Sequence, residues 1–213
     1  MLSTNNKLAT FYPMNSSGTV TYMPMAVIYD QEDTGDVIMM ESPTTHTHSL
    51  QTTTVHFDNI IQTIVKKISL SECSYVIGVM AWFSNKRIIN TLCELKGVCM
   101  ISMSSGISKS HTMQQLYSKL PGMCGKAGVQ LIDPIKEGQQ QHIVHHKFLI
   151  GLSSSMEPIW LINGSCNLTE HSVYNRENIQ INTDPTVICA YYDEFKRMLT
   201  LSYPLISTPN FRI

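Results

Sequence analysis

The sequence predicts an α/β domain. Two observations lead to this class. Short apolar runs of strand length recur along the chain, and segments with helical spacing of apolar residues lie between them. Length and composition agree, because 213 residues with 43% hydrophobic content are ordinary for one globular domain with a sizeable core.

Residues 1–54 differ from the rest and are interpreted as an N-terminal extension. Residues 19–29 alternate in hydrophobicity and residues 36–40 are mostly apolar, so these two segments could pair as a hairpin. Residues 42–54 are rich in Thr, Ser and His, which is typical of a flexible linker. The main domain is therefore expected to cover residues 55–213.

The main domain contains alternating helix and strand patterns. Its predicted helices cover residues 57–68, 85–95, 111–120 and 185–199. Its predicted strands cover residues 75–82, 98–103, 129–132, 146–150, 159–162 and 178–181. The first helix has apolar residues at helical spacing from Phe57 to Ile68, and the last begins with Pro185, which suits a first helical turn. Residues 165–173 are expected to start a helix or a turn.

Two short segments carry the residues with the most chemistry. His145-His146-Lys147 opens one predicted strand, and Gly164-Ser165-Cys166-Asn167 follows the next. Residues two apart on a strand share a face, so His145 and Lys147 point one way and His146 points the other. A histidine can attack phosphorus and a lysine can hold phosphate oxygens, while an asparagine amide and helix-start N–H groups hold the rest.

H-x-K followed by G-S-x-N resembles the signature of the phospholipase D superfamily, which cleaves phosphodiesters without a metal. The resemblance extends to the strand and helix from Tyr75 to Leu92 and to Asn175-Arg176-Glu177-Asn178, and it runs from about Phe57 to about Leu199. It implies a mixed sheet flanked by helices in a single catalytic domain, residues 55–213, with one catalytic half per chain.

The resemblance also implies roles for the site residues. His145 of one subunit would attack phosphorus and form a phosphohistidine, and the other subunit's histidine would protonate the leaving oxygen and then activate water. Lys147 and Asn167 would stabilise the five-coordinate phosphorus with help from Ser165, and Glu177 would hydrogen-bond the site histidine. Ser165 and Asn167 also suit a plain helix cap, and both roles can hold together.

The chain carries one H-x-K, whereas this mechanism needs two histidines. The resemblance therefore implies a homodimer with its site at the twofold axis. The strand around Trp160 and the turn after Asn167 are expected to contribute to the interface.

One position departs from the superfamily signature. The motif H-x-K-x-x-x-x-D has its aspartate where this chain has Leu152. In the superfamily that aspartate supports the fold and the site and does not attack phosphorus. A hydrogen bond from Ser153, Ser154 or Ser155 could replace it.

The histidines around the motif offer an alternative reading as a metal site. His142, His145 and His146 form H-x-x-H-H, which could bind zinc together with Cys166. Adjacent histidines on a strand point to opposite faces, so all three cannot converge simply. Neither a metal nor another cofactor is expected.

Other residues are weaker candidates for contact with substrate. Lys86 and Arg87 could form a phosphate track, although a solvated helix end is the plainer interpretation. His146 is a further candidate beside the motif. Trp82 could stack on a base, but its position at a strand end favours a place in the core.

The charge is nearly neutral. With 15 basic and 16 acidic residues the net charge is −1, which argues against tight nonspecific DNA binding but allows a local basic patch. The expected function is a metal-independent phosphodiesterase, foremost an endonuclease on DNA or RNA. The alternatives are a phospholipid or small-nucleotide phosphodiesterase, and a catalytically silent dimer that binds nucleic acid.

The cysteine pattern favours a reducing compartment. None of the six cysteines forms a C-x-x-C pair, and several lie in apolar runs. No apolar run has membrane-spanning length and no basic-then-apolar leader is present, so a cytoplasmic location without integral membrane association is expected.

Overall fold

The computed structural model describes residues 45–47, 52–104, 111–137 and 140–205. These residues lie in the second of two units, Pro43–Ile213. The strands expected at residues 19–29 and 36–40 fall outside the described residues.

Helices and strands alternate along this unit. The described helices are α1 (Ile60–Leu70), α2 (Lys86–Leu92), α4 (His111–Tyr117), the 3-10 helix η1 (Glu170–Tyr174) and α5 (Pro185–Thr200). The described strands are β1 (Thr45–Thr47), β2 (Thr53–His56), β3 (Tyr75–Met80), β4 (Gly97–Met103), β5 (Val129–Ile132), β6 (Ile135–Glu137), β7 (Gln140–His142), β8 (Lys147–Leu152), β9 (Pro158–Gly164), β10 (Ile179–Asn182) and β11 (Tyr203–Pro204).

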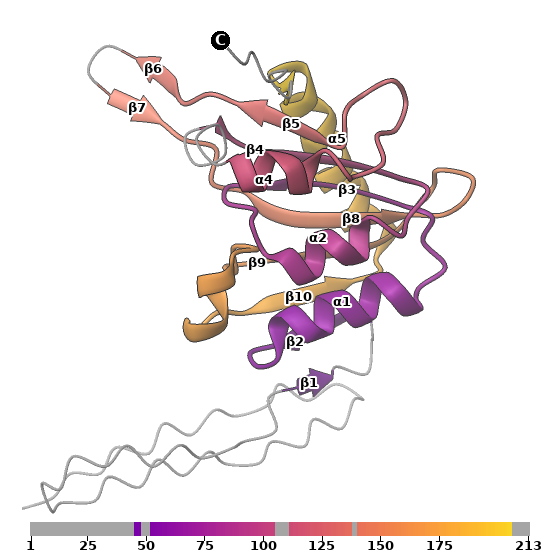
Figure 1. The fold of residues 1–213 in the computed structure, drawn as a ribbon. Helices are drawn as coiled ribbons and strands as arrows, with labels where there is room; N and C mark the ends of the chain where they lie inside the picture. The colour runs from indigo at the N-terminus through magenta and orange to yellow at the C-terminus, as the bar shows by residue number, and fades with distance from the viewer. Residues whose placement is uncertain (1–44, 48–51, 105–110, 138–139, 206–213) are drawn as a thin grey trace, which may run out of the picture. The chain divides into compact units, whose positions relative to one another are not determined.

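A mixed sheet forms the centre of the unit (Figure 1). Nine of the described strands follow the order β1-β2-β10-β9-β8-β3-β4-β5-β11. Strands β3, β4 and β5 run parallel, whereas β8 is antiparallel to both β3 and β9. Strands β6 and β7 form a separate ribbon between β5 and β8. The predicted α/β class with a mixed sheet is confirmed.

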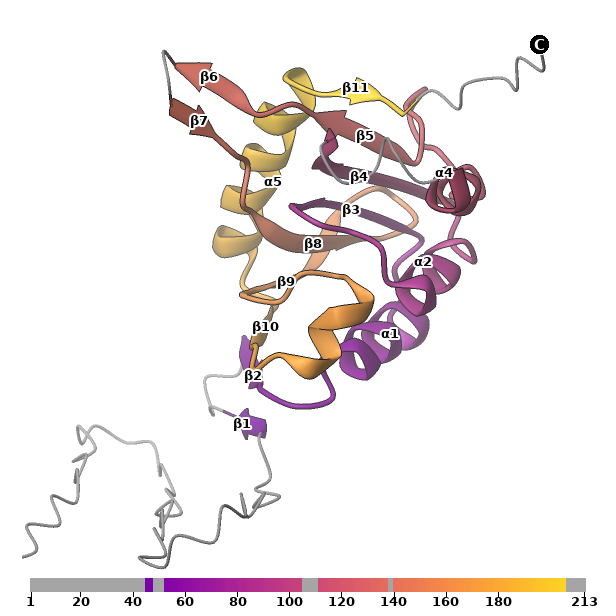
Figure 2. The ribbon, with the colours of Figure 1, turned by 60° about the vertical axis from the view of Figure 1, so that its left-hand side comes forward.

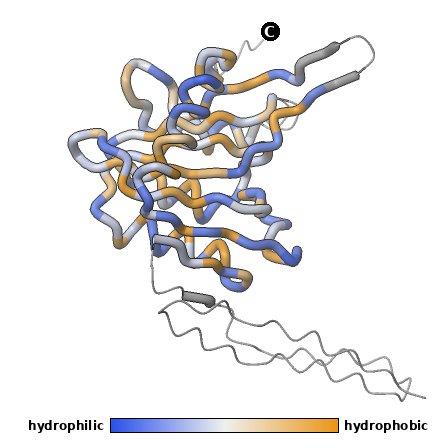
Figure 3. The backbone as a smooth tube through the Cα atoms, turned by 180° about the vertical axis from the view of Figure 1, so that it is seen from behind, coloured by the Kyte–Doolittle hydropathy of each residue, from blue (hydrophilic) through white to orange (hydrophobic). Residues whose placement is uncertain are grey.

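Helices flank the sheet on both faces (Figure 2). Helices α1, α2 and α4 cover one face, and α5 covers the other. Ile64 of α1 and Leu92 of α2 belong to the first apolar layer, while Ile188 and Phe195 of α5 belong to the second. Figure 3 shows the central strands as the most hydrophobic part of the trace. A strand buried on both faces is accordingly apolar along most of its length.

Helix α1 begins later than the spacing of apolar residues predicts. Asn59 precedes it with a φ of 52°, a left-handed conformation that a helix cannot continue through. Phe57 therefore lies outside the helix and is 47% exposed. The expectation that Phe57 belongs to the core stripe of this helix is wrong.

The sheet extends into the segment expected to be a linker. Strand β2 pairs with β10, with Val55 opposite Gln180, and β1 pairs with β2. Threonine is β-branched and fits a strand, which explains why a Thr-rich segment can complete the edge of a sheet. The compact unit thus starts at Pro43, ahead of the expected boundary at residue 55.

Helix α5 is the longest helix of the described residues, with 16 residues. The Asp184 side chain caps it by accepting hydrogen bonds from the N–H groups of Thr186 and Val187. Across the described ranges, no helix combines the length and apolar composition that crossing a bilayer requires.

Candidate active site

The motif residues gather at one end of the sheet, where β8 begins and where β3 and β9 end. Met80, the last residue of β3, pairs with Lys147, the first residue of β8. Gly164, the last residue of β9, pairs with Ile179 of β10. Both motif segments therefore lie at the same end of these strands, on the left in Figure 1.

His145 and Lys147 are in direct contact. The Nζ atom of Lys147 lies 3.1 Å from both Nδ1 and Nε2 of His145 and 3.0 Å from its carbonyl oxygen. The indole of Trp82 stands edge-on to the imidazole, with ring centroids 5.4 Å apart. The same Nζ atom lies 6.0 Å from the Trp82 ring centroid. An exposed imidazole, an ammonium group and an indole thus form one cluster.

This contact suits nucleophilic chemistry. A neutral imidazole has one nitrogen with a lone pair, and that nitrogen can attack phosphorus once it no longer accepts a hydrogen bond from the ammonium. Burial lowers the pKa of Lys147, while the negative charge of Glu177 raises it and opposes that effect. The acidic side chain therefore helps to keep the lysine protonated.

Ser165 and Glu177 join the start of the second motif to the strand beside it. Oγ of Ser165 donates to Oε2 of Glu177 and accepts a 3.0 Å bond from the backbone N–H of Asn178. Nδ2 of Asn175 donates to Oε1 of Glu177 at 3.4 Å. Within the described chain no hydrogen bond joins Glu177 to His145, the partner that the resemblance implies for it.

The glycine of G-S-C-N has a steric reason. A Cβ atom on Gly164 would lie 2.1 Å from the carbonyl oxygen of Asn178 and 2.8 Å from Cα of Ile179. Any larger residue would push β10 away from β9. Glycine is thus required where the two backbones approach most closely.

Residues 165–169 form an irregular connection that bends at Ser165, and of the expected helix or turn over residues 165–173 the helical part begins only with η1, after Thr169. The backbone N–H of Leu168 donates to the carbonyl of Trp82 at 3.2 Å, and the N–H groups of Ser84 and Asn85 donate to Leu168. Tertiary hydrogen bonds replace the local ones of a helix. The first turn of η1 starts only after Thr169, too late to offer N–H groups beside Ser165.

Asn167 lies within this connection. Its Oδ1 atom is buried and has no hydrogen-bond partner in the described structure. A buried polar atom without a partner costs about 1–3 kcal/mol, and such atoms in native proteins call for an explanation. A functional role for the carboxamide is one such explanation.

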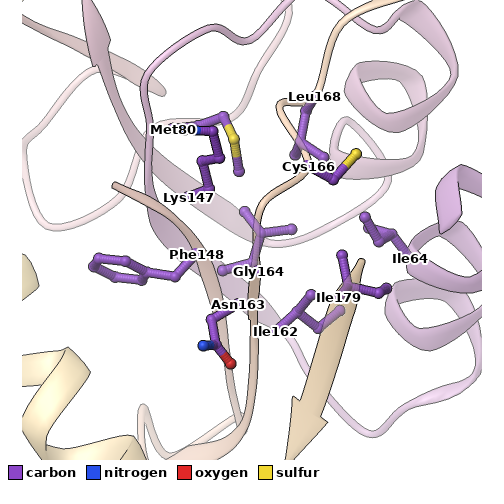
Figure 4. A pocket seen from close by; sticks show the side chains of 11 residues that line it. Ile64, Met80, Lys147, Phe148, Ile162, Asn163, Gly164, Cys166, Leu168 and Ile179 are labelled. Atoms are coloured by element: carbon purple, nitrogen blue, oxygen red, sulfur yellow. The ribbon is translucent and has the colours of Figure 1, made fainter. Parts of the chain in front are cut away.

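A narrow crevice is lined by Lys147 of the cluster and by mostly apolar residues (Figure 4). Lys147, Met80, Cys166 and Leu168 lie at one end of the crevice, and Ile179 lies toward the other end. Its free volume is about 10 Å³, which is room for about one water molecule. A substrate must therefore bind over the surface of the cluster.

Leu152 stands at the far end of β8 from His145. It is 1% exposed and packs in the apolar layer beneath α5. The nearby serines bond within the following turn, with Ser153 Oγ 2.8 Å from Ser155 Oγ and accepting from the N–H of Glu157. A strand of this length separates its ends by about 17 Å. Leu152 therefore fills the core where the superfamily motif has aspartate. The change takes no polar group away from His145 and Lys147, which lie at the other end of β8.

His146 faces away from the cluster. Its Nε2 atom lies 2.9 Å from Oε1 of Glu194 on α5, and Arg197 donates two 2.8 Å hydrogen bonds to the same carboxylate. The structure thus separates His146 from His145. Both histidines precede β8, but the 3.0 Å hydrogen bond from the N–H of Ala81 to the carbonyl of His146 continues the pairing with β3, so side chains still alternate here.

The two basic candidates on α2 also lie apart from the cluster. Both side chains are exposed. The backbone N–H of Lys86 donates to Oε1 of Glu170 at 2.8 Å, which ties α2 to η1. Arg87 lines a separate hollow.

The described residues contain no group of three or more His, Cys, Asp or Glu side chains arranged to hold a metal ion. Of the H-x-x-H-H residues, His145 contacts Lys147 and His146 contacts Glu194 on the opposite face.

Trp82 is the site residue that sequence reasoning placed elsewhere. It is 37% exposed and faces His145, whereas Phe83 is 1% exposed and lies in the core. The core interpretation of Trp82 is wrong. A usable signal was the aromatic pair itself, because two neighbours at a strand end cannot both face the same layer.

Comparison with known proteins identifies the family. Residues 64–199, more than half of the chain, match the family described as "Cardiolipin synthase, PLD-like domain". An uncharacterised protein of Acanthamoeba polyphaga mimivirus is 27% identical over 176 residues. That match covers 66% of this chain and 62% of the relative, so the chain spans less than two thirds of the relative's length.

Two solved structures share the fold. NucT from Helicobacter pylori superposes with a TM-score of 0.58 at 15% identity, covering 72% of this chain and 98% of NucT. Nuc from Salmonella typhimurium, a phospholipase D family member, gives a TM-score of 0.52 at 14% identity, covering 73% and 98% of the two chains. The predicted phospholipase D-like fold is confirmed.

Proposed function

Because the chain belongs to the phospholipase D-like family, we propose that it is a phosphodiesterase, and foremost an endonuclease that cleaves DNA or RNA. One observation carries the proposal. Lys147 Nζ contacts both ring nitrogens of His145 at 3.1 Å, at the end of the sheet where the G-S-C-N segment begins. A nucleophile and a phosphate-binding cation are thus paired at one surface.

The proposed mechanism has two steps and uses two chains. A ring nitrogen of His145 attacks phosphorus, a P–N bond forms, and the bond to the leaving oxygen breaks as His145 of the partner subunit supplies a proton. The partner's histidine then takes a proton from water, whose oxygen displaces the first histidine. Lys147 and Asn167 hold the non-bridging oxygens, with Ser165 assisting.

The charge balance supports a reaction without a metal ion. Two Lys147 ammonium groups, one from each subunit, would neutralise the charge that develops on phosphorus. Glu177 supports that role, because its carboxylate raises the pKa of Lys147 against the effect of burial. No cofactor is needed in this scheme.

A homodimer follows from the single copy of each motif. Exposed apolar side chains border the motif, notably Trp82 and Ile143, and a twofold contact would cover them. The strand around Trp160 is not available for this contact. Trp160 is 1% exposed, bonds Ser71 through its Nε1 atom, and lies in β9 between β8 and β10.

Assembly and activity can be tested together. Light scattering should give a particle of twice the 24.0 kDa chain mass at micromolar concentration. Mixing wild-type chains with His145→Ala chains should reduce activity by more than dilution, because mixed dimers lack one histidine. A strictly monomeric protein that still hydrolyses phosphodiesters would contradict the shared site.

The substrate class is tested by incubating the protein with plasmid, single-stranded DNA and RNA in excess EDTA. Wild type should cleave nucleic acid under these conditions, and His145→Ala should not, while both unfold at the same temperature. Cleavage by His145→Ala, or activity that returns only with added zinc or magnesium, would overturn the proposed mechanism.

A second candidate is a phosphodiesterase acting on a small nucleotide or a lipid headgroup. The net charge of −1 favours it, since binding to a nucleic-acid backbone usually draws on a basic surplus. Hydrolysis of a small chromogenic diester without cleavage of any nucleic acid would select this candidate. Nucleic-acid binding without hydrolysis of either substrate would instead identify a catalytically silent relative.

All six cysteine side chains are free thiols. This supports the proposal that the protein works in a reducing, cytoplasmic environment.

A further inference from the structure

A second hollow lies outside the His145 cluster, between α1 and η1, and is called here the α1–η1 hollow. Its volume is about 290 Å³. Figure 2 shows η1, the orange coil at the front, beside α1. The lining comes from the start of α1, from η1 and from one residue of α2, namely Phe57, Asp58, Asn59, Ile60, Ile61, Gln62, Ser172, Val173, Asn175 and Arg87.

The lining combines a flat aromatic surface with amide groups. Phe57 is 47% exposed, and the side chains of Asn59, Gln62 and Asn175 are exposed around it. Unpaired nucleobases are recognised by stacking on aromatic rings and by hydrogen bonds to their edges, for which Asn and Gln amides are well suited. Such a surface matches the requirements of a base.

The charges of the hollow favour a base over a phosphate. The Arg87 guanidinium and the Asp58 carboxylate both line it, so it offers no surplus of positive charge. A carboxylate repels phosphate but accepts hydrogen bonds from exocyclic amino groups of bases. The volume lies at the lower limit of about 300 Å³ for small-molecule pockets, which suits one base.

The hollow adjoins the proposed catalytic residues. Asn175, which lines it, donates to Oε1 of Glu177, and Oε2 of the same carboxylate accepts from Ser165 of the G-S-C-N segment. Two hydrogen bonds therefore connect the wall of the hollow to the second motif.

We propose that the α1–η1 hollow binds one unpaired nucleobase of the strand whose phosphodiester reacts at His145. Phe57 stacks on the base, and Gln62 and Asn175 hydrogen-bond its edge. The site would make the protein prefer single-stranded or locally unpaired nucleic acid. This inference rests on the proposed function in its nucleic-acid form.

Binding of a labelled single strand tests the proposal by fluorescence anisotropy. The full chain carries His145→Ala so that the strand stays intact, and Phe57→Ala or Gln62→Ala is added. Phe57→Ala should weaken binding about tenfold, the size typical of losing one stacked base. Gln115→Ala is the matched control, because Gln115 is an exposed helical glutamine on α4, outside the hollow.

A strand of the same length without bases serves as the reference, because it shows how much of the binding affinity depends on the bases. The His145→Ala chain should bind this abasic strand equally well with and without either hollow substitution. Unchanged affinity of both variants for the ordinary strand, or equal weakening for both strands, would overturn the proposal. A change in particle mass on Phe57→Ala would likewise overturn it, because it would show that a second copy of the chain occupies the hollow.

Failure of the subsite and failure of the proposed function give different results. If the chain hydrolyses a small chromogenic diester but binds no nucleic acid, the base site fails and the phosphodiesterase stands. If the variants lose base-dependent binding while wild type hydrolyses neither substrate, the base site stands and the enzymatic function fails.

Discussion

The backbone N–H of Leu168 donates a 3.2 Å hydrogen bond to the carbonyl oxygen of Trp82, joining two segments that are far apart in the sequence. Trp82 faces His145 on one side of this bond, and Asn167 directly precedes Leu168 on the other. The bond therefore sets how the H-x-K and G-S-C-N segments meet.

The two adjacent histidines should differ sharply in mutational effect. His146→Gln should keep most of the activity, because His146 binds Glu194 on the face of the sheet away from Lys147. Its pair with Glu194 is partly exposed, so its loss should destabilise the fold by only about 0.2–1 kcal/mol. Steady-state rates and urea unfolding check both points. Equal loss of activity in His145→Gln and His146→Gln would contradict the assignment.

Glu177→Gln should shift the alkaline limb of the pH–rate profile to lower pH. Burial lowers the pKa of Lys147, and the Glu177 carboxylate opposes that effect. Removing the negative charge lowers the pKa further, and the lysine then loses its proton at a lower pH. Because Lys147 must be protonated to hold phosphate, activity falls earlier as pH rises.

The control for this shift is Glu157→Gln. Glu157 is exposed and lies in the turn after β8, at the opposite end of that strand from His145. It should leave the profile unchanged. A Glu177→Gln profile that coincides with wild type, or that moves to higher pH, would count against a charged Lys147 in the reaction.

Gly164→Ala should damage both stability and activity. Its Cβ atom would lie 2.1 Å from the carbonyl oxygen of Asn178, so β10 must move away from β9. Overpacking of this kind typically destabilises by about 1–3 kcal/mol. The same movement separates Ser165 from Glu177 and from the N–H of Asn178. Chemical denaturation and single-turnover rates measure the two losses.

A matched exposed change tests whether that loss is local. Ser154 lies in the exposed turn between β8 and β9, so Ser154→Ala should leave both the stability and the single-turnover rate near those of wild type. A Gly164→Ala protein with wild-type stability would show that the strands tolerate the extra carbon.

Cys166 should resist alkylation although it lies inside the motif. Burial is the main cause that raises the pKa of the Cys166 thiol to about 11, and the negative charge of Glu177 adds to it. The residue is 3% exposed. Its reactive thiolate form is therefore scarce at neutral pH. Cys124 and Cys189 are exposed and should be modified first by iodoacetamide, which peptide mass spectrometry can follow. Early modification of Cys166 would mean that the motif segment opens in solution.

Much of the domain could be predicted from local patterns. Strand β5 has the predicted bounds, 129–132, and β4 differs by one residue, because continuous apolar runs mark strands buried on both faces. Helix α5 begins at Pro185 as predicted, since proline and the preceding aspartate specify a helix start locally.

Other features depended on contacts between distant segments. Residues 165–169 contain helix-capping residue types, yet tertiary hydrogen bonds such as the one from Leu168 to Trp82 take the place of the local bonds of a helix. Phe57 matches the spacing of α1, yet the left-handed Asn59 excludes it from the helix. In both places a tertiary or backbone constraint overrides the local preference.

The sequence by itself determined the two motif segments and the separation of His146 from His145 and Lys147, because the alternation of side chains along a strand is a local property of the backbone. Only the tertiary structure decided which strands are neighbours. That order brings Trp82 to His145, pairs Gly164 with Ile179 and places Leu152 in the core. Strand order depends on the joint burial of distant apolar surfaces, and no local segment of the sequence encodes it.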